Sequence, residues 1–109
     1  MKSETHLEFY QRWKKLASPY IKWQFDQFKP FVGKRCADIG CGLGNFLPYF
    51  AEKGFYLGID HDMTLVEALT KELPQDGIFS IICIDVTDPT LIKILRSYAI
   101  DSILCVNVL

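Results

Sequence analysis

The sequence predicts an α/β fold in which a doubly wound parallel sheet is covered by helices on both faces. From residue 35 onward, short apolar runs alternate with segments that carry helical signals, in the order β-α-β-α-β-α-β. The apolar runs are hydrophobic on both faces, which is typical of strands buried in a parallel sheet. Right-handed crossovers then bring the carboxyl ends of the strands to one crevice, where ligands bind in open α/β sheets.

Residues 1–34 are expected to form a helical lead-in that packs on the core. Within residues 4–17, aromatic side chains recur at spacings of three and four, which suits an amphipathic helix. A second helix is expected to begin with Ser18 as its N-cap and Pro19 at its first helical position. The sheet itself is expected to lie within residues 35–109.

That second part of the chain supplies the strands and the helices that connect them. Four strands are expected, at residues 35–39, 56–60, 78–86 and 101–109. Connecting helices are expected over residues 45–53, 64–74 and 88–99. Thr64 begins a pattern of the S/T-x-x-E form, which predicts a capping box at the start of its helix. Asp88 and Pro89 have the residue types of an N-cap and a first helical position.

The composition suits one domain with a sizeable core, because the chain has 109 residues and half of them are hydrophobic. Residues 1–35 hold eight Lys and Arg against three acids, whereas the rest of the chain holds four against ten. This basic segment fits contact with RNA or a phosphorylated substrate, or else a solvated amphipathic helix. No apolar run can span a bilayer, and the N-terminus lacks a signal-peptide core, so we expect a cytoplasmic protein.

The four cysteines indicate neither a metal site nor a disulfide framework. They form no C-x-x-C pair, have no neighbouring His, and each lies in or beside an apolar run. Small buried thiols are core residues, and a reducing compartment disfavours disulfides. We therefore expect no metal, and core positions for Cys36, Cys41, Cys83 and Cys105.

The segment ADIGCGLGNF, residues 37–46, is the strongest functional signal. An acid, Asp38, lies at the end of the expected strand, one residue before its last, and three glycines follow the strand at alternate positions. Glycines there allow a tight turn and let the backbone approach a ligand without an intervening Cβ. The expected helix after them offers free N–H groups to a polar or anionic group. A purely structural strand-to-helix turn is the alternative.

The spacing of these glycines discriminates between ligands. A dinucleotide fingerprint, G-x-G-x-x-G, requires a third glycine at position 45, where the chain has Asn45. The pattern acid-x-G-x-G-x-G instead resembles the first motif of class I methyltransferases that depend on S-adenosyl-L-methionine. The resemblance implies a Rossmann-like fold whose loop wraps the amino-acid part of the cofactor. It implies cofactor contacts from Asp38, Gly40, Cys41, Gly42 and Gly44.

Asp60 ends the second expected strand, twenty residues after Gly40. A carboxylate at that distance lies at the tip of the neighbouring strand and can accept hydrogen bonds from both ribose hydroxyls. The resemblance implies the same role and places His61 beside the adenine, as a contact residue rather than a base. The alternative for Asp60 is an N-cap, a role for which Asp62 and Thr64 are better placed.

Asp85 and Val86 end the third expected strand. The resemblance implies that Asp85 accepts a hydrogen bond from the adenine amino group and that the next backbone N–H meets a ring nitrogen. An N-cap role is the alternative, although Asp88 suits it better. Asn107, near the end of the fourth strand, resembles the family's fourth motif and would face the transferred methyl group. It could equally be a strand-end residue, so it is a weak catalytic candidate.

Other aromatic residues in the lead-in are candidates for the walls of the site. Tyr20 and Lys22 are candidates to close over the cofactor, as aromatic and basic residues before the first strand do in some relatives. Trp13 and Trp23 are expected to lie in the core or in the wall of a substrate pocket.

The resemblance implies transfer of a methyl group from S-adenosyl-L-methionine to a small-molecule or tRNA acceptor. The family sheet has seven strands and four are expected here, so we expect a truncated methyltransferase whose activity is an open question. Strand four would then present an apolar edge for self-association, with Ile103, Leu104, Val106 and Val108. The alternatives are a non-enzymatic cofactor-binding module, a half-domain that pairs with another chain through that strand, and an NAD(P)-dependent oxidoreductase.

Overall fold

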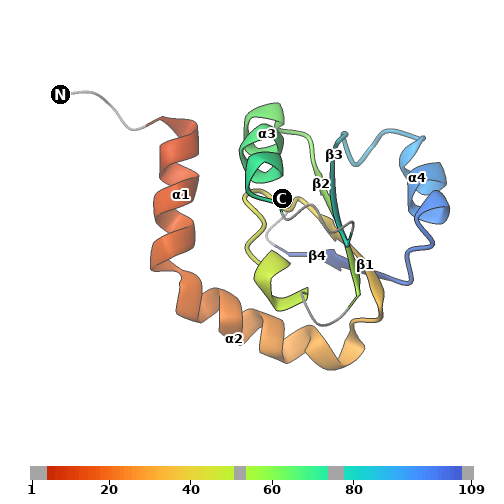
Figure 1. Cartoon of the computed structure of the whole chain (residues 1–109), viewed down its shortest axis with the longest axis horizontal. Coiled ribbons are helices and arrows are strands. Elements are labelled where there is room, and N and C mark those ends of the chain that lie inside the picture. The colour runs from red at the N-terminus through yellow and green to blue at the C-terminus, as the bar shows by residue number, and fades with distance from the viewer. Residues whose placement is uncertain (1–4, 51–53, 74–77, 107–109) are drawn as a thin grey trace.

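The computed structural model describes residues 5–50, 54–73 and 78–106, and it places a parallel sheet beside two long N-terminal helices (Figure 1). The four strands of the described chain lie in the order β3-β2-β1-β4, and every pair is parallel. The predicted fold class is confirmed. The strands are β1 (Arg35–Ile39), β2 (Phe55–Asp60), β3 (Phe79–Cys83) and β4 (Ser102–Cys105).

The register brings the carboxyl ends of the strands to one edge of the sheet. Ile39, the last residue of β1, lies opposite Ile59 of β2 and Cys105 of β4. Asp60, which ends β2, lies opposite Cys83, which ends β3. The segments that follow the strands therefore meet above this edge, as the predicted crevice requires.

The helices lie on both faces of the sheet, with α4 on one side and α2 and α3 on the other (Figure 1). None of the described helices is long and apolar enough to cross a membrane. The α-helices are α1 (His6–Leu16), α2 (Ser18–Phe28), α3 (Met63–Glu72) and α4 (Leu91–Ser97). The 3₁₀ helices are η1 (Lys29–Phe31) and η2 (Leu47–Phe50).

Two apolar layers sandwich the sheet, because the strands are buried on both faces. The layer under α2 is largely aromatic, and Phe25 packs there against the rings of Phe28, Phe46, Tyr49 and Phe50. The layer under α4 is aliphatic and consists of Ala37, Ile39, Leu57, Ile59 and Leu91. Helix α2 thus contributes directly to the core, whereas α1 has no buried residue.

The predicted α-helix over residues 45–53 is wrong for the part that the structure describes. Turns follow the glycines, and only the short η2 forms. The backbone bonds here span three residues, as in Leu47 N–H to Gly44 C=O and Tyr49 N–H to Phe46 C=O. Pro48 has no N–H, so it cannot donate the four-residue bond to Gly44 that an α-helix needs.

Three predicted N-caps are displaced by one or two residues. Asp62, not Thr64, caps α3, and its side chain accepts from the N–H groups of Thr64 and Leu65. Ala17 precedes α2 in place of Ser18, because the same residue already ends α1.

At α4 the N-cap position is Thr90 rather than Asp88. The Asp88 carboxylate instead accepts from the N–H and hydroxyl of Thr90, at 2.9 and 2.8 Å. The Asp88 carboxylate is therefore bonded to Thr90, the residue before the helix, and not to the N–H groups of the first helical turn.

Strands β3 and β4 are shorter than predicted. β3 ends at Cys83, because the Asp85 side chain turns the chain by accepting the N–H of Thr87 at 2.8 Å. In β4, Ile103 is exposed as expected of an edge strand, but Leu104 is buried against the aromatic layer. The expected edge residue Val108 lies outside the described residues.

Replacement of Phe25 by alanine tests the aromatic layer. Phe25 is 3% exposed, so Phe25→Ala is expected to lower the free energy of unfolding by about 3–5 kcal/mol through the cavity it leaves. The matched control is Trp23→Ala on the same helix, since Trp23 is 58% exposed and should cost below about 1 kcal/mol. Urea denaturation measures both. Equal losses would show that α2 does not pack as described.

Candidate functional site

A cavity of about 530 Å³ lies between the carboxyl ends of β1 and β2 on one side and α1 on the other. Its strand side includes Asp38, Asp60 and, apart from Gly44, the glycine loop, which we define as residues 40–46. His61 and Asp62 continue this wall, and α3 contributes Leu65. The structure thus brings most of the predicted cofactor residues to one cavity.

The glycine loop is fixed to β2 by its backbone. The N–H groups of Gly40 and Cys41 both donate to the carbonyl of Ile59, at 2.7 and 3.0 Å. Gly40, Gly42 and Gly44 all have positive φ values, of 71°, 54° and 70°, which other residues adopt only with strain. Glycine is therefore required by the turn itself as well as by any ligand that approaches it.

Asp60 holds the loop and faces the cavity at the same time. Its side chain is 8% exposed, and Oδ2 accepts the Gly42 N–H at 2.8 Å while Oδ1 accepts the Asp62 N–H at 2.9 Å. Each carboxylate oxygen can accept more than one bond, so both retain capacity for a ligand. The Nδ1 atom of His61 lies 3.7 Å from Oδ1, with the imidazole largely exposed.

Asp38 is more deeply buried, at 2% exposure, and Oδ2 accepts the Tyr56 hydroxyl at 2.6 Å. Burial raises the pKa of Asp38 from 3.8 to about 7; the Tyr56 hydrogen bond opposes the shift, and the charge of Asp60 adds to it. Asp38 is consequently a mixture of acid and carboxylate near neutral pH.

Cys41 lies in the glycine loop with its side chain buried, at 4% exposure. Burial, with a smaller contribution from the nearby Asp38 and Asp60 charges, raises the pKa of its thiol well above the usual range. The thiol stays neutral, so Cys41 is unsuited to act as a nucleophile here.

Four predicted site residues do not line the cavity or cannot be placed. Gly44 is buried against Leu69 beneath the loop. Asp85 and Val86 are exposed beyond the end of β3. The Asp85 pKa is lowered by the hydrogen bonds that it accepts from Thr87 and by the charge of His61. Cys83, two residues earlier, donates to the His61 carbonyl at 3.6 Å, so the segment that holds Asp85 leaves β3 beside the rim of the cavity. Asn107 lies outside the described residues.

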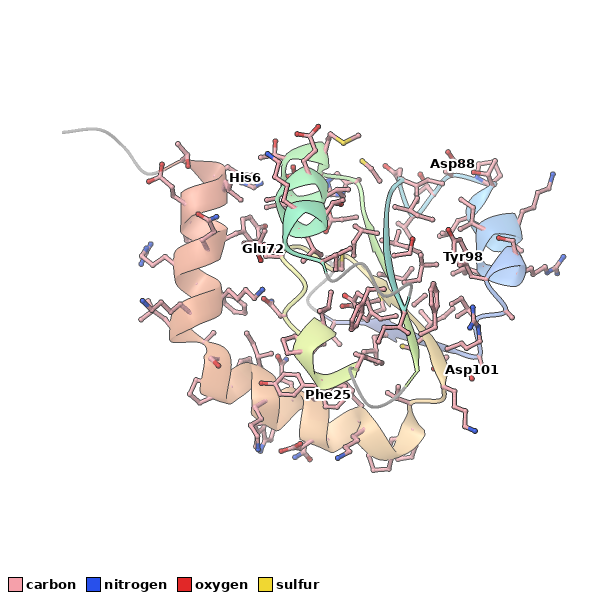
Figure 2. The ribbon with its side chains drawn as sticks, viewed as in Figure 1. His6, Phe25, Glu72, Asp88, Tyr98 and Asp101 are labelled. Carbon is pink, nitrogen blue, oxygen red and sulfur yellow. The ribbon has the colours of Figure 1, made fainter. Side chains whose placement is uncertain are left out.

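Helix α1 forms a wall of the cavity, and of its lining residues the sequence predicts only Trp13 as a possible wall residue. Two polar contacts hold the helix: His6 Nε2 lies 2.6 Å from Asp62 Oδ2, and Lys14 Nζ donates to the Leu43 carbonyl at 2.6 Å. His6 lies on the side of α1 that faces α3 (Figure 2). The aromatic spacing in residues 4–17 is the available signal, and it predicts an amphipathic helix that packs on the core.

The closure candidates Tyr20 and Lys22 do not line the cavity, and Trp23 lies in neither of its expected positions, the core or a pocket wall. Tyr20 and Trp23 are exposed on α2, where their rings stack at 6.1 Å. Lys22 pairs with Asp26 on the same helix, at 3.7 Å. Trp13 does line the cavity, in agreement with one of its two expected positions. Among the described residues, no cluster of three or more metal-ligating side chains is present.

Comparison with models of protein families identifies the family to which this domain belongs. The family model described as "Methyltransferase domain" matches residues 37–109, which include the glycine loop, Asp60, the last three residues of β1 and the other three strands. The chain belongs to the methyltransferase domain family. The expected class I methyltransferase with a Rossmann-like sheet is therefore confirmed.

A search of curated proteins finds no match to this methyltransferase domain. Among solved structures, it is similar to the crystal structure of an S-adenosylmethionine-dependent methyltransferase from Mesorhizobium loti, with 28% sequence identity and a TM-score of 0.43. The match covers 50% of this chain and 26% of that chain.

Alanine at two loop glycines should separate strain from steric conflict. A Cβ on Gly42 meets no atom within 4 Å, so Gly42→Ala carries only the strain of its positive φ, roughly 1 kcal/mol. A Cβ on Gly44 would lie 2.9 Å from Leu69 Cδ1, and Gly44→Ala should cost roughly 2–4 kcal/mol. Urea denaturation measures both. The reverse order would contradict the loop geometry.

The buried Asp38 predicts a particular dependence of stability on pH. Because the folded state raises its pKa, that state keeps a proton which the unfolded chain loses between about pH 4 and pH 7. The free energy of unfolding should therefore fall as pH rises through this window, by up to about 1.4 kcal/mol per pH unit.

Asp38→Asn should remove this slope, whereas the control Asp88→Asn should keep it. The Asp88 pKa is lowered by its Thr90 hydrogen bonds, so Asp88 titrates below this pH window. Denaturation at several pH values measures the slopes. Identical slopes in the two variants would mean that Asp38 does not carry the proton.

Proposed function

We propose that this methyltransferase domain binds S-adenosylmethionine in the cavity and transfers its methyl group to a small-molecule or tRNA acceptor. The observation that carries the proposal is the Asp60 carboxylate. It is buried at the tip of β2, holds the glycine loop through Gly42, and stands in the cavity wall. One side chain thus links the loop to the position where a ribose would lie.

The hydrogen-bonding capacity of Asp60 suits a ribose. Each of its oxygens accepts one backbone N–H, and each keeps a lone pair for a hydroxyl of the ligand. A Cβ at Gly42 would meet no protein atom, so the bare backbone there leaves room for the amino-acid part of the cofactor. His61 and Asp85, beside the rim, are proposed to contact the adenine, and the Val86 N–H to meet a ring nitrogen.

The charge of the cavity also favours this cofactor over a dinucleotide. The described lining residues include the acids Asp38, Asp60 and Asp62 and no Lys or Arg. Such a wall attracts a positively charged sulfonium centre and repels the pyrophosphate of NAD(P). Asn45 stands where a dinucleotide loop needs its third glycine. Directly after the loop the described chain forms the short η2 and not an α-helix whose N-terminus could receive a pyrophosphate.

S-adenosylmethionine, when bound, supplies a methyl group on a positively charged sulfur. A lone pair of the acceptor forms a bond to the methyl carbon while the carbon–sulfur bond breaks and its electron pair stays on sulfur. The residues of this chain would orient the two reactants and exclude water from the cavity. Binding without turnover would instead favour a cofactor-binding module.

Calorimetric titration with S-adenosylhomocysteine tests the proposal. Loss of charge-assisted hydrogen bonds should weaken binding to Asp60→Ala by roughly 30- to 100-fold. Asp60→Asn keeps one acceptor oxygen and should lie between this variant and the wild type. Urea denaturation checks that each variant is folded. Equal affinity for wild type and Asp60→Ala, or no binding to either, would contradict the proposed site.

Asp85 and Asp88 form a matched pair for the proposed adenine contact. Each accepts the N–H and hydroxyl of a threonine two residues later, so alanine removes the same local turn from both. Only Asp85 lies beside His61, and Asp85→Ala is expected to weaken S-adenosylhomocysteine about tenfold. Asp88→Ala should bind as the wild type does. A similar loss in both would point to the turn rather than to the adenine.

A further inference from the structure

The cavity-facing side of α1 is aromatic and only partly covered: Trp13 packs against the core, whereas Phe9 and Tyr10 stay exposed. Four ring-bearing residues of α1 line the cavity at helical spacing, and none of them is fully buried. Phe9 and Tyr10 are 46% and 37% exposed, an unusual degree for rings that face a domain. We call this side the aromatic wall, which consists of His6, Phe9, Tyr10 and Trp13.

The aromatic wall is fixed at both ends. The contact between His6 and Asp62 ties the first turn of α1 to the cap of α3. The bond from Lys14 to the Leu43 carbonyl ties the last turn to the glycine loop. The rings between these contacts also meet edge to face, with His6 and Tyr10 centroids 4.8 Å apart and Phe9 and Tyr10 centroids 5.7 Å apart. The wall is therefore a preformed surface.

The wall opposite α1 is acidic. Asp60 and the partly protonated Asp38 line it from the ends of β2 and β1, while His6 offsets the charge of Asp62 when the imidazole is protonated. The described lining residues include no Lys or Arg that could pair with an anion. A cation between aromatic faces and carboxylates is attracted by both, whereas a carboxylate or phosphate is repelled.

We propose that the aromatic wall binds the methyl acceptor, and that this acceptor carries an amine or other cationic nitrogen on or beside an apolar ring. The inference rests on the proposed function, because the glycine loop and Asp60 on the strand side are then occupied by the cofactor. The side of α1 is the part of the cavity left for a second ligand.

The chemistry of such an acceptor balances without a further reactant. The ammonium group first releases a proton to water. The nitrogen lone pair then forms the bond to the methyl carbon as the carbon–sulfur bond breaks, and the electron pair stays on sulfur. The products are a methylated ammonium ion, which now carries the positive charge that was on sulfur, and a neutral thioether.

The two tryptophans of the chain make a direct test possible, because Trp13 lies in the aromatic wall and Trp23 is exposed on α2. Trp23→Phe leaves Trp13 as the fluorescent reporter, and Trp13→Phe leaves Trp23. Each variant is titrated with benzyltrimethylammonium and with benzenesulfonate at constant ionic strength, with saturating S-adenosylhomocysteine.

Benzyltrimethylammonium should change Trp13 fluorescence saturably and bind at least tenfold more tightly than benzenesulfonate. Trp23 fluorescence should show no saturable change. Equal or tighter binding of the sulfonate, or equal responses from both reporters, would overturn the proposal. Displacement of the ammonium probe by S-adenosylhomocysteine would also overturn it, because the aromatic wall would then belong to the cofactor site.

A pair of tyrosine variants locates the probe. Tyr10→Ala should weaken benzyltrimethylammonium about fivefold, whereas Tyr20→Ala, an exposed position on α2, should have no effect. No difference between the two would contradict a site on α1. Calorimetry with S-adenosylhomocysteine alone separates the two proposals: cofactor binding without ammonium binding refutes only this inference. Absence of cofactor binding refutes the proposed function.

Discussion

The hydrogen bond from the Gly42 N–H to the Asp60 carboxylate is the contact on which the cavity depends. It joins the loop after β1 to the tip of β2, and the bonds from Gly40 and Cys41 to the Ile59 carbonyl hold the same loop from below. Because Asp60 is buried, its charge needs the N–H donors of Gly42 and Asp62 whether or not a ligand is present. The same carboxylate is thereby held in place for a ligand before one arrives.

Much of the fold follows from local sequence. Apolar runs bounded by glycine and acids located β1 and β2 to within one residue. Strands that are buried on both faces are apolar along their whole length, so their ends are marked by the first glycine or acid. The prediction of an α-helix after the loop is wrong, because Pro48 and the positive φ values of three glycines favour three-residue turns. The observed N-caps differ from the predicted ones because aspartate side chains accept the nearby N–H groups. Asp62 takes the N–H of Thr64 at α3, and Asp88 takes the N–H of Thr90 before α4.

The sequence predicts the strand side of the site, but on the α1 side it predicts only Trp13 as a possible wall residue. Asp38, Gly42 and Asp60 follow strand ends at fixed spacing, so topology alone brings them together. The helical spacing of Phe9 and Tyr10 predicts a common face, but it cannot tell a core from an open cavity. That distinction depends on long-range contacts, here the pairing of His6 with Asp62 across 56 residues.

The central claim is that this methyltransferase domain takes a cofactor with a sulfonium or thioether in place of a pyrophosphate. Calorimetric titration of the wild-type chain with S-adenosylhomocysteine and, separately, with NADH tests it most directly. We expect saturable one-to-one binding of S-adenosylhomocysteine and no saturable heat with NADH. Binding of NADH as tight as that of S-adenosylhomocysteine would contradict the assignment of both the glycine loop and the acidic wall.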